Sequence, residues 1–302
     1  MRTSRFVSVK LPLLLMTVPF FALVLVFGYV PLFGWLMAFE DYFPGQSIFG
    51  QSLVGFKHFE FVLNDQQFYH ALRNTLVLSA LSLLTAPAPM LLALLLNEVK
   101  RMRFRKFVQT VSSFPNFISW IIVYSIFFSF FSVDEGAINK LLLQLHWIDE
   151  PTDLLANSGA AWIFQTLVGM WKGLGWGAII YLAALSGIDQ EQYEAARVDG
   201  AGRFREAWHI SLPGMMPTFV VLFILAVGNL LAGGGFEQMF TFMNPMVMDR
   251  LENLDTYTYK IGLQGLSFSY ATAVGVMKSL VSILLLLFAN AFSKRINGRS
   301  IL

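Results

Sequence analysis

The chain has 302 residues, of which 56% are hydrophobic and 13% are charged. An ordinary soluble domain carries about 25% charged residues, and a soluble core of this length could not hide so much apolar surface, whereas lipid accepts it. The net charge of +2 argues against a nucleic-acid partner, and the absence of cysteine excludes disulfides, thiolate metal sites and a cysteine nucleophile.

Six stretches almost free of charge predict six transmembrane helices, because a spanning helix needs about 20 mostly apolar residues. We expect an all-α integral membrane protein with a single transmembrane domain over residues 1–302. The predicted spans are 11–33, 75–96, 108–131, 161–185, 213–231 and 271–292. The basic start and first apolar run are similar to a signal peptide, but the run is too long and lacks a small-residue cleavage site, so we expect an uncleaved helix.

The distribution of basic residues predicts the orientation. With the N-terminus in the cytoplasm, 14 of the 21 Lys and Arg residues fall in cytoplasmic segments and 5 in outer segments. This asymmetry follows the positive-inside rule. We therefore expect a multi-pass protein of the cell membrane with both termini cytoplasmic. The outer segments 34–73, 132–158 and 234–268 are rich in aromatic, acidic and glycine residues and are expected to be loops.

The cytoplasmic segment 187–213 between the fourth and fifth spans has the local chemistry of a short capped helix. Asp189 is placed to cap the first turn, with Gln192 three residues later as in a capping box. Ile188 and Tyr193 occupy the positions of a hydrophobic staple. Gly200 is expected to end the helix, because glycine adopts the left-handed conformation at low cost.

A second short helix is expected over residues 203–210, and Pro213 suits the start of the next spanning helix. Ala195 and Ala196 have small side chains, so another protein can approach the backbone of the first helix closely. From the residues alone, a polar hairpin that merely links two spans remains an equal alternative.

The motif content of this segment resembles the EAA loop of binding-protein-dependent ABC importer permeases. That pattern has Glu-Ala-Ala, a glycine four residues after the last alanine, and a hydrophobic–x–Leu-Pro ending about ten residues later. Its matching residues here are Glu194, Ala195, Ala196, Asp199, Gly200, Ala201, Ile210, Leu212 and Pro213. Further tracts are similar to sugar permeases of the LplB type: Trp171–Gly173, Ala183–Leu185, Asn244-Pro245, Tyr259–Leu263 and Phe268–Gly275.

The resemblance implies a fold, a mechanism and a set of partners. The fold would be the type I ABC importer permease fold (MetI-like) with six spans. The loop would be a coupling helix, moved by a separate ATPase subunit that holds ATP and Mg²⁺, so this chain would bind no cofactor. The partners would be a second permease in a heterodimer, two ATP-binding cassette subunits and an extracytoplasmic solute-binding protein. The cargo would be a carbohydrate, with an oligosaccharide, including a uronate-containing one, as the candidate.

The sequence contains no phosphate-binding G-x-x-x-x-G-K-[ST] motif, so we expect no ATPase activity in this chain. Gly169, Gly173, Gly175 and Gly177 lie in the fourth span, where glycines usually allow close helix packing. The histidines have no partner at metal-ligand spacing, so no metal site is predicted.

Five residues in or beside the spans are candidates for the solute path: Trp171, Lys172, Trp176, Asn229 and Lys278. Lysine inside a bilayer costs roughly 2.5–3.5 kcal/mol, so Lys172 should face protein or water. Either it attracts an acidic solute, or it bonds a neighbouring helix, and we favour the second reading. Lys278 and Asn229 have the same two readings, while most aromatic residues suit lipid or the membrane interface.

Two other classes of function remain as alternatives. One is an importer of the same class with a non-sugar cargo. The other is an ion-coupled carrier or a membrane enzyme that uses Lys172 and Lys278. Ion-coupled carriers usually carry carboxylates within the membrane, and the six predicted spans contain none.

Overall fold

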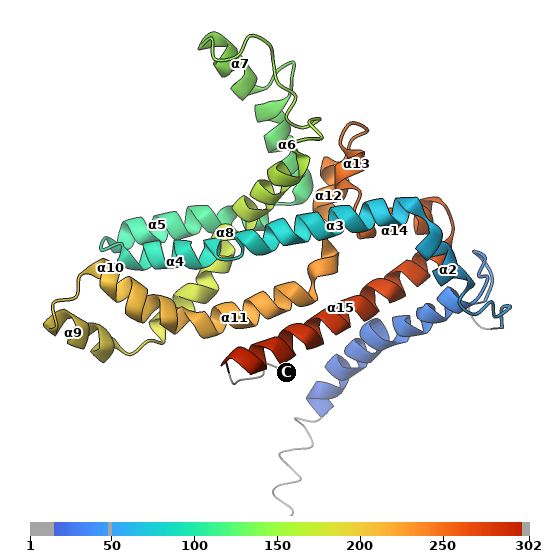
Figure 1. Ribbon diagram of the computed structural model, residues 1–302, viewed down its shortest axis with the longest axis horizontal. Helices are drawn as coiled ribbons and strands as arrows, with labels where there is room; N and C mark the ends of the chain where they lie inside the picture. The colour runs from blue at the N-terminus through green and yellow to red at the C-terminus, as the bar shows by residue number, and fades with distance from the viewer. Residues whose placement is uncertain (1–14, 48–49, 298–302) are drawn as a thin grey trace, which may run out of the picture. The chain divides into compact units, whose positions relative to one another are not determined.

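The computed structural model describes residues 15–47 and 50–297, and this part of the chain is built from helices (Figure 1). Its only extended pairing is an isolated bridge between Glu40 and Leu53. The all-α prediction is therefore confirmed. The residues form two compact units, one up to Asp65 together with Thr258–Lys278, and one over Gln66–Tyr257 together with the chain after Lys278.

Five helices are long and apolar enough to cross a membrane, and they coincide with five of the predicted spans. They are Leu15–Phe39, Gln66–Glu98, Ala161–Ser186, Arg203–Gly228 and Phe268–Phe292. The second comprises α3 (Gln66–Thr85) and α4 (Ala88–Glu98) and begins nine residues before the predicted span. The first ends six residues later than predicted, because the apolar run after residue 33 continues as a 3-10 helix.

The third predicted span, 108–131, is not one straight helix. The chain forms α5 (Met102–Ser113), a 3-10 turn (Phe114–Phe117) and α6 (Trp120–Phe131), and the two parts meet at 107°. Pro115 lies in the turn and has no N–H to continue the helical hydrogen bonds. Ser119 then caps α6 by accepting a hydrogen bond from the Ile122 nitrogen at 3.4 Å.

The larger unit is organised around α8 (Ala161–Ser186), which packs against α4 and α5 (Figure 1). A side chain at Gly175 would bring its Cβ within 2.2 Å of the Ser112 backbone, and one at Gly177 would meet Pro89 at 3.0 Å. The glycines of this helix therefore allow the close packing that the sequence predicts. A buried apolar cluster with Met90, Leu185 and Met215 lies at one end.

At the other end of this unit, the segment expected as a loop carries short helices, α12 (Phe236–Phe242), α13 (Met248–Leu251) and α14 (Leu254–Tyr259). The buried Asn74 amide donates to the carbonyls of Asp249 and Glu252 at 3.0 and 2.9 Å. Thr75 accepts a hydrogen bond from the Leu254 nitrogen at 2.9 Å. These bonds fix the segment to the start of α3. A further helix, α7 (Ala137–Gln144), follows α6.

The smaller unit contains Leu15–Phe39, α2 (Lys57–Asn64), a π-helix (Lys260–Gln264) and the first part of α15 (Phe268–Asn297). The Ser269 hydroxyl donates to the Glu40 carbonyl at 2.6 Å and accepts from the Tyr42 nitrogen at 2.9 Å. Nearby, the hydrogen bond from Lys57 lowers the pKa of Asp41 below its ordinary value. The two hydrogen bonds of Ser269 join chain segments that lie more than 200 residues apart.

Candidate functional site: a bridged short helix and a groove in the bundle

The predicted short helix is present as α9 (Gln190–Val198), and both of its ends are capped. Asp189 accepts a hydrogen bond from the Glu191 nitrogen at 3.0 Å. At the other end, the Ala201 nitrogen donates to the Ala196 carbonyl at 2.8 Å, and the Gly200 nitrogen donates to the Arg197 carbonyl at 3.1 Å. With Gly200 at φ +77°, this is a Schellman motif. The structure therefore has the predicted glycine turn.

The second predicted helix does not stand alone. α10 (Arg203–Glu206), a π-helical turn (Ala207–Ser211) and α11 (Leu212–Gly228) form one continuous helix. Pro213 lies in the first turn of α11. Its nitrogen has no hydrogen to donate, and the wider π-turn just before it lets the helix pass the proline without breaking. The fifth span thus begins at the glycine turn, about ten residues earlier than predicted.

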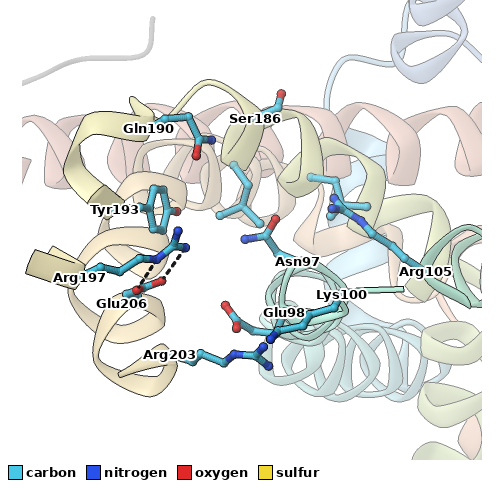
Figure 2. A pocket seen from close by; sticks show the side chains of 12 residues that line it. Asn97, Glu98, Lys100, Arg105, Ser186, Gln190, Tyr193, Arg197, Arg203 and Glu206 are labelled. Carbon is cyan, nitrogen blue, oxygen red and sulfur yellow. Dashed lines mark hydrogen bonds and ion pairs between the residues drawn. The ribbon is translucent and has the colours of Figure 1, made fainter. Parts of the chain in front are cut away.

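Two side-chain bridges clamp α9 to this long helix. Arg197 donates from Nε to Oε1 of Glu206 at 2.9 Å and from Nη2 to Oε2 at 3.3 Å (Figure 2). The Glu206 hydrogen bond raises the pKa of Arg197. The hydroxyls of Tyr193 and Ser211 lie 2.9 Å apart and are buried. Neither bridge was predicted from the sequence, although opposite charges on either side of a glycine turn are a visible signal for the Arg197–Glu206 pair.

Ile188, one of the two residues of the predicted staple, packs against the start of α11. A Cβ at Gly214 would come within 2.3 Å of the Ile188 Cδ1, so Ile188 lies directly against the long helix. It also packs against the buried cluster that includes Leu185 and Met215. Contacts before and after α9 therefore make the loop one unit with the fifth span.

The remaining residues of the predicted coupling loop leave α9 accessible. Glu194, Ala195, Asp199, Gly200 and Pro213 are exposed, and Ala196, Ala201, Ile210 and Leu212 are half-buried. Large apolar side chains are exposed beside them: Val198 is 88% exposed, and Phe204 and Trp208 stack with ring centres 6.3 Å apart. An accessible apolar surface flanking a charged helix is typical of a protein-docking site.

A groove of about 340 Å³ lies inside the bundle of the larger unit. Its walls carry hydrogen-bonding side chains from three helices: Ser82, Thr85, Gln165, Thr166 and Gln238. The Gln238 amide donates to the Gln165 side-chain oxygen at 2.9 Å and to its carbonyl at 2.7 Å. These residues were not predicted from the sequence; polar residues inside apolar spans are the relevant signal for all of them except Gln238, which lies in a predicted outer loop.

Four of the five predicted path residues, Trp171, Lys172, Trp176 and Asn229, lie in the larger unit, and none of the four lines the groove. Lys172 is buried and donates to the Asn116 carbonyl at 2.9 Å, with its ammonium 5.2 Å from the centre of the Trp120 ring. It thus bonds the chain between α5 and α6. Trp171 and Trp176 are partly exposed and pack on Phe127 and Phe117, respectively. Asn229 donates back to the Leu225 carbonyl at the end of α11, and Lys278 lies half-buried in α15.

Comparisons with known proteins agree with this architecture. Residues 85–298 match the family model described as the binding-protein-dependent transport system inner membrane component. Protein LplB of Bacillus subtilis is 44% identical over 94% of this chain and 88% of its own length. The polygalacturonan/rhamnogalacturonan transport system permease protein YteP of the same organism is 43% identical over 96% of this chain and 89% of its own length.

Two solved structures are also similar. A chain of a bacterial ABC transporter involved in the import of the acidic polysaccharide alginate superimposes with a TM-score of 0.87 at 35% identity, covering 98% of this chain and 99% of that chain. A chain of the alginate ABC transporter in complex with alginate pentasaccharide-bound periplasmic protein gives a TM-score of 0.88, with both chains fully covered. The chain is therefore a membrane-integral permease of the binding-protein-dependent ABC importer family.

Proposed function

We propose that this permease carries an acidic oligosaccharide, of the uronate-containing kind, across the membrane. The observation that carries this proposal is that two relatives are both described as transporting an acidic polysaccharide or its fragments. The polygalacturonan/rhamnogalacturonan permease and the alginate transporter are each similar to nearly the whole chain, and polygalacturonan and alginate are both acidic polysaccharides. The groove supports a sugar cargo, because its amides and hydroxyls suit the hydroxyl groups of a carbohydrate.

We further propose that ATP hydrolysis takes place on a separate subunit and reaches this chain through α9. The supporting geometry is a helix that is capped at both ends and bridged to the fifth span by Arg197–Glu206 and Tyr193–Ser211. A movement of α9 would therefore also move the fifth span, because the two helices are joined by side-chain bridges and not by a flexible loop. Glu194, Ala195, Ala196 and Gly200 are the proposed docking residues, and the chain itself would hold neither ATP nor Mg²⁺.

The assembly we propose contains a second, different permease, two ATPase subunits and an external solute-binding protein. Both termini lie in the cytoplasm, together with α9. The basic segments of the sequence support this orientation. The alginate transporter solved with its periplasmic binding protein supports the external partner.

The cargo is tested by ATP-dependent uptake into proteoliposomes that contain the assembled transporter and its binding protein. Labelled oligogalacturonate is compared with a neutral oligosaccharide of the same length. We expect accumulation of the acidic oligosaccharide and little of the neutral one. Equal uptake of both would overturn the proposed cargo, and accumulation without ATP would overturn the proposed mechanism.

A further inference from the structure

A cavity of about 600 Å³ lies next to α9, apart from the groove in the bundle (Figure 2). Its walls come from the end of α4, the start of α5, the end of α8, α9 and α10. The volume falls in the range typical of small-molecule sites. It is far larger than an inorganic ion needs and has room for an organic ligand.

The charges that line this cavity do not balance. Lys100, Arg105 and Arg203 face it together with the carboxylate of Glu98, while Arg197 and Glu206 neutralise each other. In the described part of the chain, none of the first three cations has a carboxylate within ion-pair distance. Three cations around one carboxylate leave a surplus positive charge in a concave site, which favours an anionic ligand.

The position of Arg105 on α5 determines that its side chain faces the cavity. The less exposed positions of that helix are Arg105, Val108, Gln109, Ser112 and Ser113, and they follow the spacing of one helix face. Val108 packs against the buried cluster of α4 and α8, so the same face directs Arg105 into the cavity. Arg103 lies on the opposite, exposed face and does not line the cavity.

The position of α5 indicates what kind of anion reaches the cavity. Its exposed face carries Met102, Phe104, Phe107 and Val111, and its first turns are basic. The apolar side chains suit acyl chains, and basic residues in the first turns of a membrane helix suit the level of the lipid headgroups. Basic pockets between helices at that level hold phosphate groups of anionic lipids, and guanidinium groups bind phosphate through paired hydrogen bonds.

We propose that this cavity is a binding site for a phosphate ester. Arg105, Arg203 and Lys100 supply the positive charge that attracts the phosphate, and Asn97, Ser186 and Gln190 offer hydrogen bonds to the remainder of the ligand. The ligand bridges α9–α10 and α4–α5, and so holds the coupling helix against the bundle. The inference rests on the proposed function only in placing α9 at the cytoplasmic face. The phosphate can come from a lipid headgroup or from a soluble ester, which share this chemistry.

The test uses the complete transporter, and its readout is binding. Thermal unfolding is followed in nanodiscs of phosphatidylcholine with or without phosphatidylglycerol, and separately with glycerol phosphate against chloride at equal ionic strength. A ligand that binds the folded state raises the unfolding temperature in proportion to its occupancy. A shift with phosphatidylglycerol alone identifies a lipid headgroup, and a shift with glycerol phosphate identifies a soluble ester.

The double variant Lys100→Gln/Arg105→Gln should lower the apparent affinity at least about tenfold, the effect of losing one charged hydrogen-bonded contact. Arg103→Gln is the matched control, with the same charge change on the other face of α5, and should respond like wild type. Arg203→Gln provides a second test from the opposite wall if the double variant does not assemble.

Three results would overturn the proposal. These are no shift with either probe, an unchanged response in both the double variant and Arg203→Gln, and a response that appears only after the ATPase subunits are removed. The last result would mean that partner side chains fill the cavity. Loss of uptake with binding retained would count against the proposed cargo and coupling, and not against this site.

Discussion

At the scale of single residues, Lys172 is the clearest case in which geometry decides between two readings of a charge. Its ammonium group donates to the Asn116 carbonyl in the turn between α5 and α6 and lies over the Trp120 ring. A sharp bend frees backbone carbonyls that lipid cannot satisfy. Lys172 satisfies one of them, so the geometry fits a bond between helices better than an attraction for solute.

Replacing Lys172 with methionine should therefore damage the bend regardless of cargo. Leaving a buried carbonyl unpaired costs about 1–3 kcal/mol. We expect a lower unfolding temperature for the assembled transporter and equal loss of uptake for acidic and neutral oligosaccharides. Lys140→Met, an exposed change on α7, serves as the control. A selective loss of uptake for the acidic oligosaccharide would instead indicate that Lys172 lines the solute path.

The Arg197–Glu206 bridge should respond unequally to the removal of its two partners. Glu206 is 6% exposed, whereas the Arg197 side chain is 64% exposed. Arg197→Gln strands a buried carboxylate at a cost of about 1–3 kcal/mol, while Glu206→Gln leaves an arginine that water solvates. Limited proteolysis of the loop should show faster cleavage for Arg197→Gln than for Glu206→Gln. The exposed Arg205→Gln should match wild type, and the reverse order of the two variants would contradict the asymmetry.

At the scale of elements, two glycines beside α9 allow a controlled test of the coupling helix. Gly200 has φ +77° and Gly202 has φ −80°, and a Cβ at either position meets no atom within 4 Å. Alanine at Gly200 should cost about 1–2 kcal/mol, because the left-handed conformation strains a Cβ. Alanine at Gly202 should change stability by less than about 0.5 kcal/mol.

Gly200→Ala should accordingly lower transport and the stimulation of ATPase activity by loaded binding protein, with normal membrane insertion. Gly202→Ala should retain both activities. The two are compared by the ratio of solute moved to ATP hydrolysed in proteoliposomes. Equal ratios in the two variants would mean that the Schellman turn does not carry the coupling.

The glycines of α8 give a second matched pair. A Cβ at Gly175 would overlap the Ser112 backbone, whereas Gly173 meets nothing within 4 Å and lines the groove. Gly175→Ala should lower stability by about 1–3 kcal/mol through overpacking, seen as a reduced unfolding temperature. Gly173→Ala should keep wild-type stability and alter uptake by narrowing the groove. Similar stabilities for the two would show that α8 and α5 separate easily.

Most of the spanning helices could be predicted from the sequence, and there are physical reasons why the bend in the third span could not. The fourth span was predicted as 161–185 and is found as Ala161–Ser186, because hydropathy and length alone determine where such a helix fits. The bend before Trp120 was not predicted, because hydropathy measures the composition of a segment and not the direction of the chain. Pro115 is its local sign.

The site was predictable to the extent that it is local. The glycine turn and the Asp189 cap depend on neighbouring residues, and both are present. The Tyr193–Ser211 contact and the groove around Gln165 and Gln238 depend on how helices pack. Periodicity in one segment carries no information on such contacts.

At the scale of the whole molecule, the orientation is open to a direct test because the chain has no cysteine. Single cysteines at Arg103 on α5 and Lys140 on α7, both exposed, give one reporter for each side. A membrane-impermeant thiol reagent added to intact cells should label residue 140, and residue 103 should react only after permeabilisation. Labelling in the opposite pattern would reverse the proposed topology.

The continuous helix Arg203–Gly228 has 26 residues, a length of about 39 Å at 1.5 Å per residue. That exceeds the roughly 30 Å hydrocarbon core of a bilayer, so this continuous helix is one rod that joins the proposed ATPase-docking loop to the membrane interior. Tilting such a rod by about 10° about its lower end sweeps its upper end sideways by about 7 Å. Under the proposed coupling, a small movement of α9 beneath the membrane is thereby magnified with distance along the helix.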